Sequence, residues 1–105
     1  TQKELQAMRY LEKQGMKILQ RNFRCHMGEI DLIAQDGACI VFVEVKYRTS
    51  SRYGSPFEAV NARKQTTIRK VAQYYLLGRK QLDCPVRFDV VGICGNELEH
   101  IKNAF

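Results

Sequence analysis

The sequence predicts a mixed α/β (α+β) domain in which helices flank a central mixed β-sheet, in the order αβββαββ. Two observations lead to this prediction. Residues 1–14 and 55–77 repeat their apolar side chains at helical spacing and begin with helix-capping residues. The other apolar segments are short, rich in β-branched residues and separated by turn residues, which is typical of strands. A length of 105 residues suits a single domain, residues 1–105.

The first predicted element is a helix over residues 1–14. Thr1 and Glu4 have the spacing of a capping box, in which each side chain bonds the backbone amide of the other residue. The apolar residues that follow recur every three or four positions, so they form one face of a helix. Gly15 is the kind of residue that ends a helix.

Three strands are predicted next, over residues 17–24, 29–35 and 38–47. The first alternates poorly and resembles an edge strand. Gly28 separates the first two segments, and Asp36-Gly37 is a strong hairpin signal between the second and the third. These three segments are therefore expected to form an antiparallel meander.

A basic, polar loop over residues 48–53 is expected to lead into a long helix over residues 55–77. Ser55 suits the N-cap, Pro56 the first helical position and Glu58 the third. Glu58 is accordingly interpreted as the capping partner of Ser55.

Two more strands, over residues 85–94 and 97–101, complete the predicted sheet. Asp89 interrupts the first of them, which otherwise has the composition of a buried strand. Because an unpaired buried charge is costly, we expect Asp89 to form a hydrogen bond or a salt bridge with Arg87 or with a helix.

The composition restricts the environment and the partners. The net charge of +6 and the pI near 9.3 favour polyanions, nucleic acid before others. The longest apolar run, residues 38–43, is too short to cross a bilayer, and the first residues do not resemble a signal peptide. We therefore expect no membrane association and a cytoplasmic location. The four cysteines lack CxxC spacing, which disfavours a zinc or redox site.

Two opposite charges interrupt the most apolar predicted strand. Glu44 and Lys46 lie two residues apart within residues 40–47, so both point to the same face. A charged side chain in a buried strand needs a partner, a metal ion or a solvated cleft, because its desolvation is costly. The alternative is that the two residues pair with each other on an exposed face of the sheet.

The predicted hairpin brings more carboxylates to this face. With Asp36-Gly37 as a two-residue turn, Glu29 faces Glu44, and Asp31 projects from the same side of the sheet. A three-residue loop would instead put Asp31 on the opposite face. Like charges paired across strands are destabilising, so this cluster suggests a divalent cation, Mg²⁺ or Mn²⁺, held by carboxylate oxygens.

Several motifs of the chain resemble the YraN family of bacterial proteins. The most specific are Gly28-Glu29-Ile30-Asp31-Leu32-Ile33-Ala34 and Val41-Phe42-Val43-Glu44-Val45-Lys46-Tyr47-Arg48. Motifs within residues 4–11, 54–60, 64–65, 87–91 and 100–105 extend the resemblance over nearly the whole chain. The resemblance implies a restriction-endonuclease-like core, similar to that of archaeal Holliday-junction resolvases.

The same resemblance implies a site and an activity. The superfamily motif, an acid followed by D…(D/E)-x-K, falls on Asp31, Glu44 and Lys46, with Glu4 as the acid contributed by a helix. Asp31 and Glu44 would hold the Mg²⁺ or Mn²⁺, and Lys46 would assist the reaction. The implied activity is that of an endonuclease that hydrolyses phosphodiester bonds in DNA, including branched recombination and repair intermediates. For Glu4 the alternative is its capping role, and for Glu29 it is a solvated position at a strand start.

A nucleic-acid-binding surface is expected around this site, formed by Arg24, Arg48, Arg52, Arg63, Lys64 and Gln65. Tyr47 and Tyr53 are interleaved with these residues and could stack on bases or pack the loop. For Lys64 the alternative is a side chain that snorkels to solvent, and for the whole set it is a solvated basic face.

Two other functions stay open. One is a catalytically silent nucleic-acid-binding module or DNA-repair accessory protein, and the other is a protein-interaction domain whose basic face is only solvated. An exposed edge strand at residues 17–24 or 97–101 would support a homodimer, which suits enzymes that act on two-fold symmetric substrates.

Overall fold

The computed structural model describes residues 2–48, 60–81 and 83–105, apart from the side chain of Arg48. These residues form α1 (Gln2–Lys13), β1 (Lys17–Cys25), β2 (Gly28–Asp36), β3 (Cys39–Arg48), α2 (Ala62–Gly78), β4 (Val86–Cys94) and β5 (Glu97–Ile101). The predicted class and the order αβββαββ are confirmed. Neither α1 nor α2, the helices of the described residues, has the length and apolar character needed to cross a membrane.

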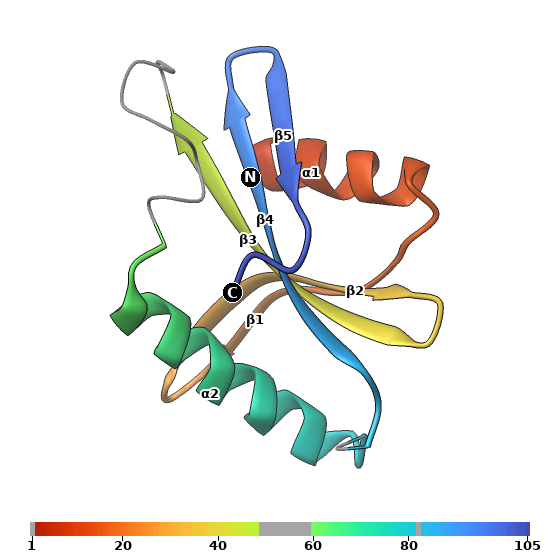
Figure 1. Ribbon diagram of the computed structural model, residues 1–105, viewed down its shortest axis with the longest axis vertical. Coiled ribbons are helices and arrows are strands. Elements are labelled where there is room, and N and C mark those ends of the chain that lie inside the picture. Colours follow the sequence, from red (N-terminus) through yellow and green to blue (C-terminus); the bar gives the residue numbers. More distant parts are fainter. Residues whose placement is uncertain (1, 49–59, 82) are drawn as a thin grey trace.

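The five strands form one mixed sheet in the order β1-β2-β3-β4-β5 (Figure 1). Neighbouring strands are antiparallel except β3 and β4, which pair in parallel and are connected through α2. A parallel pair needs such a crossover, because its two strands run in the same direction. β1 and β5 are the edges, as predicted for residues 17–24 and 97–101, and the homodimer stays a prediction.

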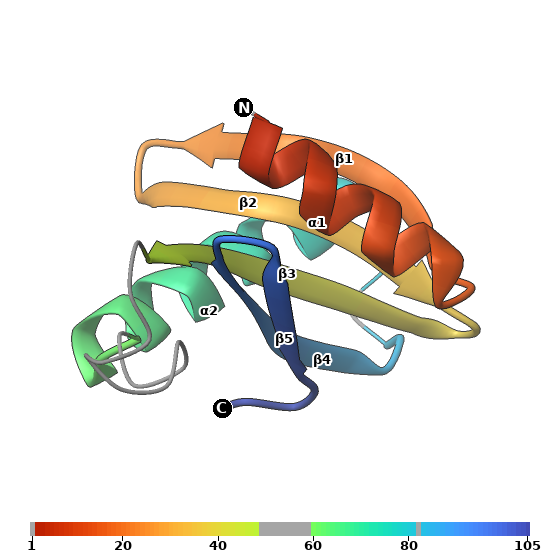
Figure 2. The same ribbon diagram turned by 90° about the horizontal axis from the view of Figure 1, so that it is seen from above.

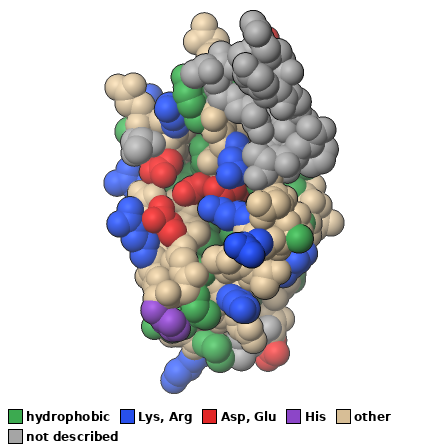
Figure 3. Space-filling model, turned by 90° about the vertical axis from the view of Figure 1, so that its left-hand side faces the viewer, with side chains coloured by type: hydrophobic (Ala, Val, Ile, Leu, Met, Phe, Trp, Pro, Cys, Tyr) green, Lys and Arg blue, Asp and Glu red, His purple; other side chains and the backbone are tan. Residues whose placement is uncertain are grey.

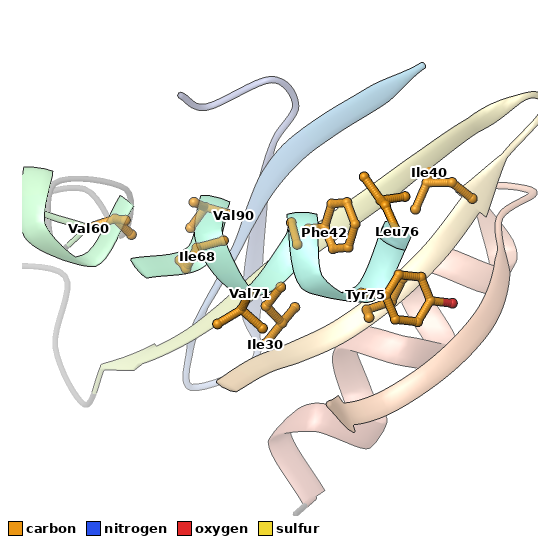
Figure 4. Close-up of a cluster of buried hydrophobic side chains, with 11 residues drawn as sticks. Ile30, Ile40, Phe42, Val60, Ile68, Val71, Tyr75, Leu76 and Val90 are labelled. Carbon is orange, nitrogen blue, oxygen red and sulfur yellow. The ribbon is translucent and has the colours of Figure 1, made fainter. Parts of the chain in front are cut away.

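The two helices cover opposite faces of the sheet (Figures 1 and 2). On one face Ile68, Val71 and Tyr75 of α2 pack against strand residues such as Ile30 and Phe42, and side chains from both layers interdigitate (Figure 4). On the other face Ala7 and Leu11 of α1 are fully buried against β2, β3 and β4; the strand residues there are Leu32, Ala34, Val41, Val43, Val91 and Ile93. Burial on both faces explains why the central strands are almost continuously apolar.

The hairpin between β2 and β3 turns one residue later than predicted. Its turn residues are Gly37 and Ala38, and Asp36 pairs with Cys39. Gly37 has a φ of 61°, which glycine adopts at little cost. The register is therefore shifted by two residues, so the predicted pairing of Glu29 with Glu44 is wrong. A shift of two does not by itself move Asp31 off the face of Glu44, because side chains alternate with a period of two.

The long helix begins later than predicted. Val60 and Asn61 are not helical, and α2 starts at Ala62 with Asn61 as its N-cap. The Asn61 side chain accepts a hydrogen bond from the backbone N–H of Lys64 at 2.9 Å, which is the usual role of asparagine at this position. A continuous helix over residues 55–77 is therefore wrong at residues 60–61, and the proposed cap at Ser55, Pro56 and Glu58 lies outside the described residues.

Asp89 of β4 is completely buried and fully hydrogen-bonded. Arg87 donates to both of its carboxylate oxygens at 2.9 and 3.0 Å, and the backbone N–H of Asn103 donates at 3.0 Å. His100 contacts the same carboxylate through Nε2 at 2.7 Å. The predicted partnership with Arg87 is confirmed. Burial by itself would raise the pKa of Asp89, but the donated hydrogen bonds outweigh it and hold that pKa below its ordinary value.

The same network reaches α1. Nδ1 of His100 lies 3.1 Å from the hydroxyl of Tyr10, and the two rings meet edge to face. With a neutral imidazole, Nε2 donates to Asp89 and Nδ1 accepts the hydroxyl proton of Tyr10. One buried chain of hydrogen bonds thus connects α1, β5 and β4.

We expect Asp89→Asn to lower the free energy of unfolding by about 3 kcal/mol, because it leaves the Arg87 guanidinium without its buried counter-charge. The pKa of Asp89 is lowered in the folded protein, so its stabilisation is present above its ordinary pKa of 3.8 and is lost as the pH falls further. Urea unfolding at pH 7 and at pH 3 measures both effects.

Asp36→Asn is the matched control. Asp36 accepts one hydrogen bond from Arg87, at 3.0 Å, and its side chain is 36% exposed. Its substitution should lower the free energy of unfolding by less than about 1 kcal/mol. Equal losses for the two variants would contradict the central role of Asp89.

Candidate functional site

The candidate site forms where β2 and β3 stop pairing. Their ladder ends at the pair Leu32 and Val43, and Asp31 is the next residue of β2. One oxygen of the Asp31 carboxylate accepts the backbone N–H of Val45 at 2.8 Å. A side chain thus satisfies a backbone donor of β3 beyond the end of the ladder.

β2 is irregular at Asp31. Ile30 and Ile33 both lie in the core beneath α2, whereas Leu32 lies in the core beneath α1. In a regular strand Ile30 and Leu32 would share a face, so the alternation of side chains is interrupted between them. On β1 the paired residues skip Asn22, which has a φ of 52°. Asparagine tolerates this left-handed conformation better than most residues. The irregularity places Asp31 within reach of both α1 and β3.

Glu44 is a buried carboxylate on the α2 side of β3, with 7% of its surface exposed. Two ammonium groups lie near it, Nζ of Lys46 at 3.9 Å and Nζ of Lys64 at 3.8 Å. Its carboxyl group also shares a hydrogen bond with that of Asp31. The alternative placed a Glu44–Lys46 pair on an exposed face of the sheet. The two groups do lie close, but Glu44 is buried, so the exposed position is wrong.

The two carboxyl groups hold protons more tightly than usual. Burial, and then the neighbouring Asp31, raise the pKa of Glu44 to about 7, although Lys64 and Lys46 act in the opposite direction. Burial also raises the pKa of Asp31, against the hydrogen bonds from Val45 and Glu44. Two carboxyl groups in contact disfavour each other's ionisation, and the two lysines offset this only in part.

Two further carboxylates meet Asp31 from the other side. Oxygen atoms of Glu4, Glu29 and Asp31 all lie within 4.8 Å of one another, a spacing that could hold a metal ion. Glu4 comes from the first turn of α1, and Glu29 follows the β1–β2 turn. Glu29 also forms an ion pair with Arg24 at 2.7 Å. Asp31 thus belongs to two acidic contacts, one with Glu44 and one with Glu4 and Glu29.

Figure 3 shows acidic side chains gathered on one face of the molecule, with lysine and arginine side chains around them. The described basic residues at the site are Arg24, Lys46 and Lys64, each within 4 Å of a carboxylate oxygen. A dense acidic centre with a basic rim can attract a metal ion and a phosphate group at once.

The other residues predicted to bind nucleic acid do not form one group in the part of the chain that the structure describes. Arg63 is exposed at the start of α2, next to Lys64. The side-chain amide of Gln65 donates to the carbonyl oxygen of Val60 at 3.0 Å, so it braces the backbone before the helix. Arg52 and Tyr53, with the rest of the predicted basic loop, lie outside the described residues, and so does the side chain of Arg48.

One contact at the site was not predicted. Nζ of Lys3 lies 3.4 Å from the centre of the Tyr47 ring, which joins the start of α1 to the end of β3. Nothing in the sequence connects these two residues, because the contact depends on how α1 lies across the sheet. A surface hollow between α1 and β5, lined by Tyr10 and Leu98 among others, contains none of the acidic residues of the site.

Comparison with known proteins identifies the relatives of the chain. A family model described as uncharacterised protein family UPF0102 matches residues 3–93. A UPF0102 protein of Lachnoclostridium phytofermentans is 50% identical over 104 residues, which cover 98% of this chain and 88% of that protein. A UPF0102 protein of Geobacter metallireducens is 52% identical, with 94% and 84% covered. These matches confirm the family resemblance that the sequence motifs indicated.

We expect Glu44→Gln to stabilise the protein at pH 8 by roughly 2 kcal/mol, and much less at pH 5. The pKa of Glu44 is raised by folding from 4.5 to about 7, so the unfolded chain ionises first as the pH rises. The wild-type protein therefore loses stability between these two values, and the neutral glutamine does not. Urea unfolding of both proteins from pH 5 to pH 8 measures the difference.

Glu99→Gln provides the control, since Glu99 is exposed on β5. Its substitution should leave the free energy of unfolding almost unchanged at every pH. A stability difference for Glu44→Gln that does not vary with pH would contradict the raised pKa.

Proposed function

The chain belongs to the uncharacterised protein family UPF0102, and for this member we propose a metal-dependent endonuclease activity on DNA. The observation that carries the proposal is the position of Asp31, whose carboxylate lies between Glu44 on one side and Glu4 and Glu29 on the other. Partly buried acids that converge on one another and have perturbed pKa values are typical of functional sites.

The donor set suits a hard divalent cation. It consists of carboxylate oxygens alone, and Mg²⁺ and Mn²⁺ are bound by carboxylates, water and phosphate oxygens. Asp31 would hold the ion with Glu44 or with Glu4 and Glu29, and a bound ion of this kind polarises a phosphate and lowers the pKa of a coordinated water molecule. The ion would also offset the burial and the neighbouring Asp31 charge that raise the pKa of Glu44.

Two lysines are placed to act on a phosphate group. Lys46 and Lys64 approach Glu44 from different elements, β3 and α2, and their side chains keep 25% and 44% of their surface exposed. Each can therefore reach a ligand at the surface while it stays near the carboxylates. We propose that Lys46 stabilises the charge that develops on the phosphate during hydrolysis, and that Lys64 binds a neighbouring phosphate.

The substrate class follows from charge. The net charge of +6, and the exposed Arg24 and Lys64 near the acidic centre, favour a nucleic-acid backbone over a small acidic metabolite. The proposed restriction-endonuclease-like core adds the expectation of DNA, with branched recombination or repair intermediates among the substrates.

We expect Mg²⁺ or Mn²⁺ to support cleavage of DNA flaps, junctions, single strands or duplexes by the purified protein. Asp31→Asn and Lys46→Ala should each reduce the rate by at least about a hundredfold. Asp31→Asn should also weaken metal binding, measured by isothermal titration and by the metal-dependent rise in melting temperature, whereas Lys46→Ala should leave it nearly unchanged.

Glu99→Gln, a substitution at an exposed acid of the edge strand β5, should retain both cleavage and metal binding. If no divalent ion binds and no substrate is cleaved, while DNA still binds with strong salt dependence, the protein is a silent nucleic-acid-binding module instead.

A further inference from the structure

An aromatic surface lies beside the acidic site and has no part in it. Tyr74 of α2 is 47% exposed, although the adjacent Tyr75 is 4% exposed and packs in the core. Leu77, one turn further along α2, is 54% exposed and extends the same apolar surface. Single exposed apolar residues are common, but tyrosine is enriched at binding interfaces, because its ring is apolar and its hydroxyl is polar.

The Tyr74 ring is held from two directions. Phe23 of β1 lies 6.3 Å from it, between ring centres, and also packs edge-on against Tyr75. His26, which is exposed in the β1–β2 turn, meets Tyr74 edge to face at 5.9 Å. The Tyr74 ring is therefore positioned before any ligand binds, and nearly half of its surface remains available.

The β1–β2 turn lies directly against α2, which fixes this arrangement. A Cβ atom at Gly28 would come within 2.8 Å of Cγ2 of Thr67, and the φ of Gly28 is 154°. Only glycine allows the turn to approach the helix this closely. The turn therefore holds His26 beside Tyr74, and Glu29 of the acidic site follows it immediately.

Positive charge borders the aromatic surface. Lys70 is exposed one turn before Tyr74 on the same face of α2. Tyr74 lies ten residues after Lys64, which is about 15 Å along the helix axis. At about 3.4 Å per nucleotide, this distance corresponds to some four nucleotides along a stacked strand, and fewer in an extended one.

We propose that Tyr74 and His26, flanked by Lys70, form a stacking site for unpaired bases of a nucleic-acid strand whose backbone passes the acidic site. Bases in a duplex already stack on each other, so an exposed ring selects a strand that is single or locally unpaired. The proposal rests on the proposed function, since it places the stacked bases a few nucleotides from the bond to be cleaved.

The chain contains no tryptophan, so Tyr74→Trp creates a single fluorescent reporter at this position. In EDTA, a single-stranded oligonucleotide should quench its emission about twofold through base stacking, and a blunt duplex of equal length should quench it little. Val86→Trp is the control. Val86 is exposed at the start of β4, where it pairs with Ile40 near the start of β3, whereas Glu44 lies further along β3. Its emission should not change.

Affinity gives the second measurement. Tyr74→Ala should weaken binding of the single strand about tenfold, and Tyr74→Phe should preserve it, since the ring face does the stacking. A folded Tyr74→Ala variant with unchanged affinity would overturn the proposal. So would unquenched emission from the Tyr74→Trp variant in a complex that forms by fluorescence anisotropy, or equal quenching by an acidic peptide.

The two proposals fail separately. Neither binding measurement needs a metal ion or cleavage. Quenching without any metal-dependent cleavage would therefore remove only the catalytic proposal, and cleavage without quenching would remove only the stacking site. Absence of nucleic-acid binding under all conditions would overturn the stacking site directly.

Discussion

The hydrogen bond from the backbone of Val45 to the carboxylate of Asp31 is the contact on which the site depends. A sheet ladder that continued past Leu32 and Val43 would have satisfied this amide with a carbonyl group and directed the side chains to alternate faces. Instead the strands separate, and a carboxylate occupies the point of separation. The acidic centre is therefore a consequence of where the pairing of β2 and β3 ends.

Two buried acids on neighbouring strands show how differently the fold treats negative charge. Asp89 receives a bidentate guanidinium, a backbone amide and an imidazole, and its pKa is lowered. Glu44 has two ammonium groups at nearly 4 Å and a second acid beside it, and its pKa is raised. The protein can bury a carboxylate with complete compensation and does so at Asp89. The incomplete compensation at Glu44 is what makes it a candidate for binding and chemistry.

The sequence predicted most of the fold because apolar periodicity and turn residues report local structure directly. It also predicted that Asp31 and Glu44 share a face, since a two-residue shift in register preserves the faces. It did not predict that α2 starts at Ala62, because asparagine is a suitable N-cap but also occurs within helices, so Asn61 alone does not mark a helix start. The convergence of Glu4 and Glu29 on Asp31 depends on the docking angle of α1 and on the irregularity at Asn22, neither of which leaves a local signal. The aromatic surface at Tyr74 was missed for the same reason, since Phe23, His26 and Tyr74 meet only in the folded chain.

The network of Tyr10, His100 and Asp89 also has a mechanical meaning. Tyr10 and Glu4 are six residues apart on α1, about 9 Å along one stiff helix. Near one end of the helix, Tyr10 is bound through His100 of the edge strand β5 to the buried Asp89, and near the other end Glu4 contributes a carboxylate to the acidic centre. The position of Glu4 therefore depends on a hydrogen-bonded contact at the far edge of the sheet.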